Sequence, residues 1–231
     1  MTEAADPRTA HRYDGESEWR RIGAVGKVEN ILSLCEAHPH RTILEIGAGE
    51  GSIAHRLGEL EFAQELHALE ISESGVAAIA ARQVPSLVEC RLFDGYAIPY
   101  ADEQFDLAIL SHVIEHVEHP RKLVYEAMRV ARHVFVEVPT EDTLRLPRNF
   151  ITDDLGHINY FSPTTIRLLL QSCGLEVLAQ RTTNPPKAAY VYRAGGRGVL
   201  SYLVKQTALG IAPAIATQLW TYHSALICRS S

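Results

Sequence analysis

The chain has 231 residues, a formal net charge of −6 and 46% hydrophobic residues. These values are typical of a globular protein with one full hydrophobic core. The acidic balance, with no block of basic residues, argues against a protein whose main task is to bind a nucleic-acid backbone. The four cysteines lie far apart and form no C-x-x-C pair, so we expect neither a zinc knuckle nor a disulfide framework.

The chain is predicted to divide into a flexible N-terminal arm over 1–18 and a single domain over 19–231. The arm is acidic and polar and lacks apolar periodicity. It also lacks the apolar stretch of a signal peptide, so we expect a cytoplasmic protein. At the start of the domain, apolar residues at helical spacing predict an amphipathic helix over 19–35.

A regular alternation of strands and helices follows. Short apolar runs predict strands over 42–46, 66–71, 87–93, 105–111 and 133–138, with helices over 52–60, 72–82 and 120–131. Such alternation implies parallel strands joined by right-handed crossovers, and hence a three-layer α/β sandwich. A long loop over 140–163, a helix over 163–172 and strands over 175–180 and 221–228 complete the chain.

An apolar insertion over about 184–220 precedes the last strand. Its segment 198–220 carries a single charge, Lys205, and is long enough to span a bilayer. Polar residues dilute it, and Gly210 and Pro213 interrupt it, so we predict a buried or interfacial helix pair. The insertion can line an acceptor pocket or form a dimer face, and both are favoured over contact with lipid.

The strongest functional signal is the sequence EIGAGEGS over 45–52, between the first strand and a helix. Glycines in such a loop permit positive φ and let a ligand approach the backbone. In a dinucleotide-binding loop the third glycine comes three residues after the second, whereas the spacing here is G-x-G-x-G. The carboxylate of Glu45 suits a cationic amine and repels a pyrophosphate. The loop therefore favours a ligand with an ammonium and a sulfonium over NAD.

Two further acidic residues lie at the ends of the second and third predicted strands, at the same edge of the sheet as the glycine loop. Glu70 closes the second strand, where a carboxylate can accept hydrogen bonds from both ribose hydroxyls of an adenosine. Asp94 precedes Gly95 at the end of the third strand, where it can accept from the exocyclic amine of adenine. Alone, the Asp94–Gly95 pair would indicate a common turn.

With the loop and these two acids, three segments resemble class I S-adenosylmethionine-dependent methyltransferases. The similarity is strongest to the small-molecule branch that contains the ubiquinone- and menaquinone-biosynthesis enzymes. The segments are IPYADEQFDL over 98–107, SHVIEHV over 111–117 and GHINYFS over 156–162. The resemblance covers about 44–178. It implies a Rossmann-like three-layer fold with a mostly parallel seven-stranded sheet whose last strand is antiparallel. It also implies S-adenosyl-L-methionine as cofactor and S-adenosyl-L-homocysteine as product.

The resemblance assigns cofactor-binding residues as well. The methionine part would lie at Glu45, Gly47, Ala48, Gly49 and Gly51, the ribose at Glu70, and the adenine at Ile71, Asp94 and Gly95. Ser111 and His112 would line the floor near the sulfonium.

Three histidines are candidate bases for an acceptor that must lose a proton. His112 and His116 follow the fourth strand, and His157 lies in the long connection that can fold back over the same mouth. The alternative is that these side chains make local hydrogen bonds.

A metal site is a further alternative. His112, Glu115, His116 and His157 resemble, with one change, the E-x-x-E-H…H set of some metal-dependent O-methyltransferases, and would suit zinc, iron or manganese better than magnesium. We predict no metal, because His112 replaces a glutamate of that set and the ligands are split between two segments.

The sequence thus predicts an enzyme that transfers a methyl group to a small-molecule acceptor, most readily to oxygen. Arg20 or Arg21 can pair with the cofactor carboxylate, or belong to a solvated tail. An RNA or protein methyltransferase is disfavoured by the acidic balance. A non-catalytic S-adenosylmethionine-binding regulatory module also remains open. We expect no nucleic-acid partner and no stable membrane insertion, and we leave a homodimer open.

Overall fold

The computed structural model describes residues 17–146 and 156–230. Most of the predicted arm over 1–18 lies outside these residues. The strands are β1 (Thr42–Ile46), β2 (Glu65–Glu70), β3 (Leu87–Leu92), β4 (Phe105–Ser111), β5 (Ala131–Pro139), β6 (Leu175–Thr183) and β7 (His223–Ser230). The helices are α2 (Glu18–Cys35), α3 (Ser52–Glu59), α4 (Glu73–Arg82), α5 (Pro120–Val130), α6 (Pro163–Ser172), α7 (Lys187–Ala194), α8 (Gly196–Ile211) and α9 (Pro213–Leu219).

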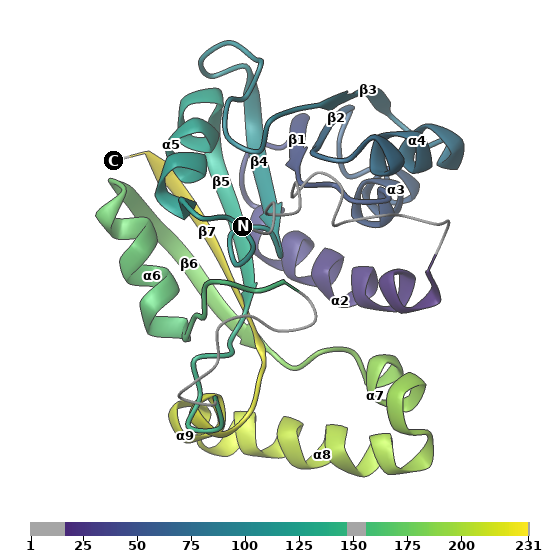
Figure 1. The fold of residues 1–231 in the computed structure, drawn as a ribbon. Coiled ribbons are helices and arrows are strands. Elements are labelled where there is room, and N and C mark those ends of the chain that lie inside the picture. The colour runs from purple at the N-terminus through teal and green to yellow at the C-terminus, as the bar shows by residue number, and fades with distance from the viewer. Residues whose placement is uncertain (1–16, 147–155, 231) are drawn as a thin grey trace, which may run out of the picture.

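Seven strands form one sheet through the described part of the chain, in the order β3-β2-β1-β4-β5-β7-β6 (Figure 1). Strands β1 to β5 pair in parallel, and β7 is antiparallel to both of its neighbours. The predicted fold class is therefore confirmed, including the antiparallel last strand.

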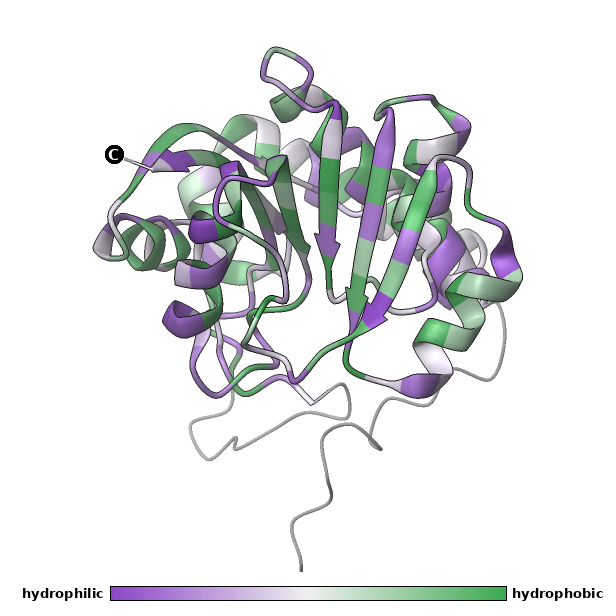
Figure 2. Cartoon of the chain, turned by 90° about the horizontal axis from the view of Figure 1, so that it is seen from above, coloured by the Kyte–Doolittle hydropathy of each residue, from purple (hydrophilic) through white to green (hydrophobic). Residues whose placement is uncertain are grey.

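Side chains that alternate along the strands create one hydrophobic core on each face of the sheet. On one face, α5 and α6 cover residues such as Leu44 and Leu110. On the other face, α2, α3 and α4 cover residues such as Ile43 and Ile109. Figure 2 shows the result as mainly hydrophobic strands between helices that carry both hydrophobic and hydrophilic residues. The arrangement is a three-layer sandwich.

Polar side chains replace apolar ones where the central strands end. Glu45 on β1, Ser111 on β4 and Glu137 on β5 are all buried. Each alternates in step with the core residues that face α2, such as Ile43 and Ile109. Open α/β sheets bind ligands beyond the carboxyl ends of their strands, so these three residues place the candidate site against α2.

Segment 198–220 of the apolar insertion forms the expected helix pair, α8 and α9, and the helix α7 precedes it (Figure 1). Gly195, with φ of +55°, separates α7 from α8, and Pro213 begins α9. Of the two predicted environments, buried or interfacial, the buried one is wrong, because the short helices α7 and α9 leave much of α8 uncovered. Its exposed large apolar residues include Leu200, Leu203, Val204, Ile211 and, on α9, Ile215. No described helix is both long and apolar enough to cross a bilayer.

Candidate active site

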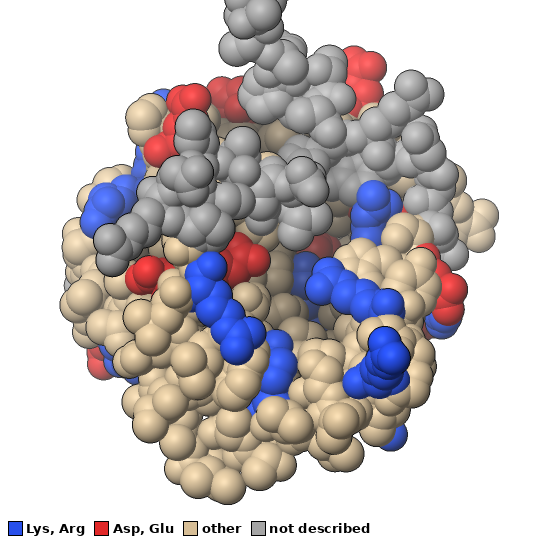
Figure 3. All heavy atoms as spheres, turned by 60° about the horizontal axis from the view of Figure 1, so that its bottom comes forward, with Lys and Arg blue, Asp and Glu red and all other residues tan. Residues whose placement is uncertain are grey.

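A cavity of about 640 Å³ lies between the glycine loop and the insertion. The α2 helix forms another wall, and the ends of β4 and β5 and the start of β7 form its floor. Figure 3 shows a hollow in this face, with basic and acidic side chains around it. Among the predicted site residues, the cavity is lined by Glu45, Gly47, Ala48, Gly49, Ser111, His112 and His157.

The glycine loop has the backbone that its sequence predicts. Gly47, Gly49 and Gly51 have φ of +73°, +61° and +77°, which only glycine adopts without strain. Gly47 N and Ala48 N donate to the carbonyl oxygen of Leu69, which ties the loop to the end of β2. At Gly47 a Cβ would also lie 2.7 Å from Val113 Cγ2, so the loop has no room for a larger residue there.

Glu45 is poised for a cationic ligand. Its side chain is 3% exposed, and its Oε2 accepts no hydrogen bond from any described residue. Burial raises the pKa of Glu45 to about 8, because desolvation disfavours the charged carboxylate, and the positive charge of Lys27 and the backbone amide of Ala54 only partly offset this. An ammonium group in the cavity would satisfy the orphaned oxygen. The residues present therefore fit the amino group of S-adenosylmethionine.

Glu50, within the loop, has a structural role that its sequence position did not reveal. Its buried carboxylate lies 2.7 Å from Arg20 Nη1 and 3.2 Å from Arg82 Nη2, and it accepts from Ser52 Oγ. The pair with Arg20 joins α2 to the loop, and the pair with Arg82 joins α4 to it. Arg20 binds Glu50 and also lines the cavity, while Arg21 is exposed beside Glu18, so pairing of Arg20 with the cofactor carboxylate stays a prediction.

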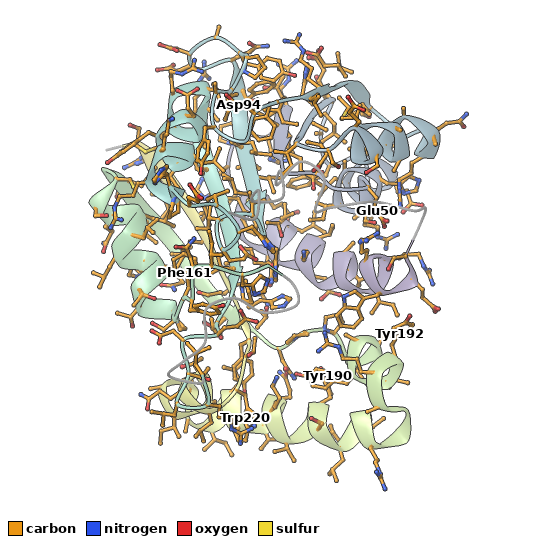
Figure 4. The ribbon with its side chains drawn as sticks, viewed as in Figure 1. Glu50, Asp94, Phe161, Tyr190, Tyr192 and Trp220 are labelled. Carbon is orange, nitrogen blue, oxygen red and sulfur yellow. The ribbon has the colours of Figure 1, made fainter. Side chains whose placement is uncertain are left out.

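The residues expected at the adenosine lie together at the ends of β2 and β3, outside the cavity. Glu70 is buried, and its two oxygens accept from Gly49 N and from Ser72 N and Oγ. Ile71 lies beside Gly95. Asp94 is exposed and accepts from two following backbone amides, which lower its pKa. Figure 4 shows Asp94 well apart from Tyr190 of the insertion.

His112 lies between two buried carboxylates at the end of β4. Its Nε2 is 3.2 Å from Glu137 Oε1, and its Nδ1 is 3.4 Å from Glu115 Oε1. Burial holds the pKa of His112 well below its usual range. For Glu137, burial alone would raise the pKa, but the rings of His112 and His223 lower it below the ordinary value. This cluster shapes the floor of the cavity around a charged Glu137.

The connection after β5 returns to the segment after β4, as the position of His157 suggested. Ile158 N and Asn159 N donate to the carbonyl oxygen of Glu115, and Asn159 Nδ2 donates to Ile114 O and Val117 O. His157 is thereby buried at the cavity wall, with Nδ1 2.7 Å from Glu141 Oε2.

The four candidate metal ligands are divided between two groups. Potential ligand atoms of Glu115, His116 and His157 lie within 4.8 Å of one another, while His112 is grouped with Glu137 and His223. His116 does not line the cavity, and its ring lies against that of His157. The set E-x-x-E-H…H is therefore not reproduced as one four-residue cluster among the described residues.

Several residues that lie in the cavity wall or beneath its floor were not identified from the sequence. Lys27 reaches the cavity from α2, and no described residue forms a hydrogen bond or ion pair with it. His223 enters beside the end of β5, because antiparallel pairing sets it opposite Pro139, and its Nδ1 is 3.4 Å from Glu137 Oε1. Asn30 Nδ2 donates to Glu137 Oε2 at 2.8 Å. Glu137 itself carried one signal, since it is a charge inside an apolar strand.

The fold and the glycine loop define a class I methyltransferase. Residues 19–180 match a methyltransferase domain family, and the chain belongs to that family. The demethylmenaquinone methyltransferase of Renibacterium salmoninarum is 24% identical over 76% of this chain and 63% of its own length. The chain spans between 20% and 63% of the length of the curated relatives it matches.

Solved structures agree on the fold. The [4+2]-cyclase SpnF has a TM-score of 0.65 at 17% identity, and the similarity covers 94% of this chain and 84% of SpnF. Magnesium protoporphyrin IX methyltransferase from Synechocystis PCC 6803, solved with S-adenosylhomocysteine, has a TM-score of 0.59 at 14% identity, with coverage of 92% and 84%. These structures show that the chain has the fold expected of the methyltransferase domain family that it matches.

Proposed function

We propose that this methyltransferase methylates a hydroxyl oxygen of a small-molecule acceptor in the cavity between the glycine loop and the insertion. One observation carries the proposal. A cavity of metabolite size joins the residues that fit the cofactor amine to a histidine held by a carboxylate. Walls on several sides suit a compact acceptor better than a polymer.

In this proposal, residues of the chain orient the cofactor and supply a base for the acceptor hydroxyl. When bound, S-adenosylmethionine supplies an activated methyl group on a sulfonium. Glu45 and the glycine loop would hold its methionine part, and such orientation lowers the barrier for in-line displacement. His157 would accept the proton that the acceptor hydroxyl gives up on methylation. Glu141, bound to Nδ1 of that ring, fixes the tautomer that leaves Nε2 as the acceptor.

His112 and His116 have different parts in this proposal. Both ring nitrogens of His112 lie beside carboxylates, so we assign it to positioning at the floor of the cavity and not to proton removal. His116 supports the ring of His157 from outside the cavity. Asp94, Gly95, Glu70 and Ile71 are proposed to hold the adenosine, as the resemblance implied.

The test uses S-adenosylmethionine with a labelled methyl group and a complete soluble cell extract. After the reaction, filtration separates small molecules from protein and RNA. We expect label in the small-molecule fraction with the wild-type protein and a large loss with His157→Asn, while calorimetry shows unchanged binding of S-adenosylhomocysteine. Label confined to protein or RNA would identify a macromolecular acceptor instead. Binding without any transfer would favour a regulatory module.

A further inference from the structure

Among the described residues, the side chains that line the cavity carry more positive charge than the lining acids neutralise. The cationic lining residues are Arg20, Lys27, Arg193 and Lys205, and the acidic ones are Glu45, Glu50 and Glu141. Two of the acids are already engaged, Glu50 by Arg20 and Arg82 and Glu141 by His157. The third, Glu45, lies at the glycine loop, where the cofactor amine would pair with it. Lys27 lies within the electrostatic influence of the buried carboxylates of Glu137, Glu115 and Glu45. Arg193 and Lys205 are therefore the two lining cations left without an anionic partner among the described residues.

Lys205 faces the cavity from α8. Gly198, Ser201 and Lys205 recur at helical spacing and form the side of α8 that lines the cavity. The ammonium of Lys205 donates to Thr221 O at 2.7 Å and lies 5.1 and 5.0 Å from the ring centres of Tyr190 and Tyr222. In Figure 4, Tyr190 lies between α2 and α8. The carbonyl and the two rings orient the ammonium, but they leave its full charge uncompensated.

Arg193 brings a second positive charge to the same space. Its guanidinium stacks 4.2 Å over the ring of Trp19, which joins α7 to the start of α2 at the cavity wall. No described carboxylate pairs with it. Burial, with the nearby charges of Arg193 and Arg145, lowers the pKa of Lys205 to about 8. Like charges facing one cavity repel each other unless an anion lies between them.

The cofactor cannot neutralise the positive charge that lines the cavity. S-adenosylmethionine has one carboxylate, but its ammonium and sulfonium leave it with a net charge of about +1 near neutral pH. Lys27 lies near Glu45 at the loop side and is the cation placed to meet that carboxylate. Arg193 and Lys205, on the insertion, lie on the acceptor side. Cofactor binding therefore increases the positive charge that the acceptor meets.

We propose that the acceptor is an anion, and that Lys205 and Arg193 bind its carboxylate or phosphate group while Tyr190 packs against its body. This inference rests on the proposed function, because it names the acceptor class of the same cavity. The anionic group is a binding handle held by the insertion. The methyl group goes to a hydroxyl elsewhere on the molecule, so the product keeps the negative charge.

The first test measures binding and needs no knowledge of the natural acceptor. Protein saturated with S-adenosylhomocysteine is titrated by calorimetry with hydroxybenzoates, with their neutral hydroxybenzamides and with hydroxyphenyl phosphate. We expect at least one acid to bind in the millimolar range or better, and at least about tenfold more tightly than its amide. Preference for phosphate over carboxylate, or the reverse, identifies the anionic group. No binding by any acid, or equal binding of acid and amide, would overturn the proposal.

Variants assign the effect to the insertion. We expect Lys205→Gln and Arg193→Gln each to weaken acid binding about tenfold or more, and Lys205→Arg to retain most of it. Arg197→Gln is the matched control, because Arg197 is an exposed cation on α8 outside the cavity. Unchanged acid affinity in both glutamine variants, with melting temperatures near that of the wild type, would contradict the assignment.

A second test separates this inference from the proposed function. The labelled product formed from cell extract is passed over an anion exchanger at neutral pH. Retention of the label supports an anionic acceptor with an intact handle, and a labelled product that is neutral or cationic overturns it. If acids bind as expected but no label is transferred, the proposed methylation fails while the anion site stands.

Discussion

Cofactor binding is predicted to depend on the protonation of Glu45. The pKa of this carboxyl is about 8 in the free protein, because burial disfavours its charge. The positive charge of Lys27 and the backbone amide of Ala54 lower this pKa only in part, and the negative charge of Glu70 raises it further. An incoming ammonium pairs with the ionised form, so that form must be populated before binding. At pH 7 about one molecule in eleven carries the ionised carboxylate, which costs about 1.4 kcal/mol of binding free energy.

The affinity for S-adenosylhomocysteine should therefore rise about ninefold from pH 6 to pH 7 and about fivefold from pH 7 to pH 8, and level off above that. Calorimetry at pH 6, 7 and 8, in two buffers of different ionisation enthalpy, measures both the affinity and the protons exchanged. We expect release of about 0.9 proton per ligand at pH 7. Glu45→Gln should bind more weakly, with no such release, while the exposed acid variant Glu73→Gln on α4 should match the wild type.

Equal affinity at pH 6 and 8, or the same proton release from the Glu45→Gln protein, would refute this reasoning. Folding stability responds in the opposite sense. Because the folded-state pKa of about 8 exceeds the ordinary 4.5, the folded protein holds the proton more tightly than the unfolded chain. The stabilisation is complete below about pH 4.5 and is lost as the pH rises through 8, an effect that Glu45→Gln should remove from thermal melts.

Four further predictions follow from single contacts. Glu70→Ala should weaken S-adenosylhomocysteine binding at least about tenfold in calorimetry, because the Glu70 carboxylate accepts a hydrogen bond from Gly49 N and is proposed to bind the ribose. An unchanged affinity would refute the placement of the ribose at Glu70. His157→Asn should reduce labelled methyl transfer about 100-fold or more without changing affinity for the product, and equal loss of both would indicate a structural role. Gly198→Ala should lower the free energy of unfolding, measured by denaturant titration, by about 1–3 kcal/mol, because the new Cβ would collide with Tyr190 O. Gly210→Ala on the same helix places its Cβ in open space and should be neutral or slightly stabilising. Treatment with EDTA should leave methyl transfer unchanged, and stoichiometric metal in protein purified without chelator, together with loss of activity on its removal, would contradict this.

The fold was largely predictable because its signals are local. The βα alternation from β1 to β5 sets a parallel sheet, and the helix and strand limits fall within a few residues of those expected. The insertion was less predictable. Its composition suggested a buried or interfacial helix pair, and the choice between the two could not be made from composition. In the structure α8 is covered on one side only, since α7 and α9 are short and Gly195 and Pro213 fix their ends.

The cavity was only half predictable, for a physical reason. The loop side depends on one turn, so Glu45, Gly47 and Gly49 could be assigned from the family resemblance. The remaining groups meet through long-range pairing. His223 reaches Glu137 because β7 pairs antiparallel with β5, and Lys205 reaches the cavity only after α8 folds back beneath α2. Neither contact could be predicted from the spacing of residues in the sequence.

The central claim is that the glycine loop holds the cofactor with its sulfur open to the cavity that the insertion closes. A crystal structure with S-adenosylhomocysteine tests this most directly. We predict the amino group at Glu45 Oε2, the carboxylate toward Lys27, and the sulfur facing the space between His157 and Lys205. A ligand whose sulfur points away from this cavity, or whose amine lies far from Glu45, would contradict the account.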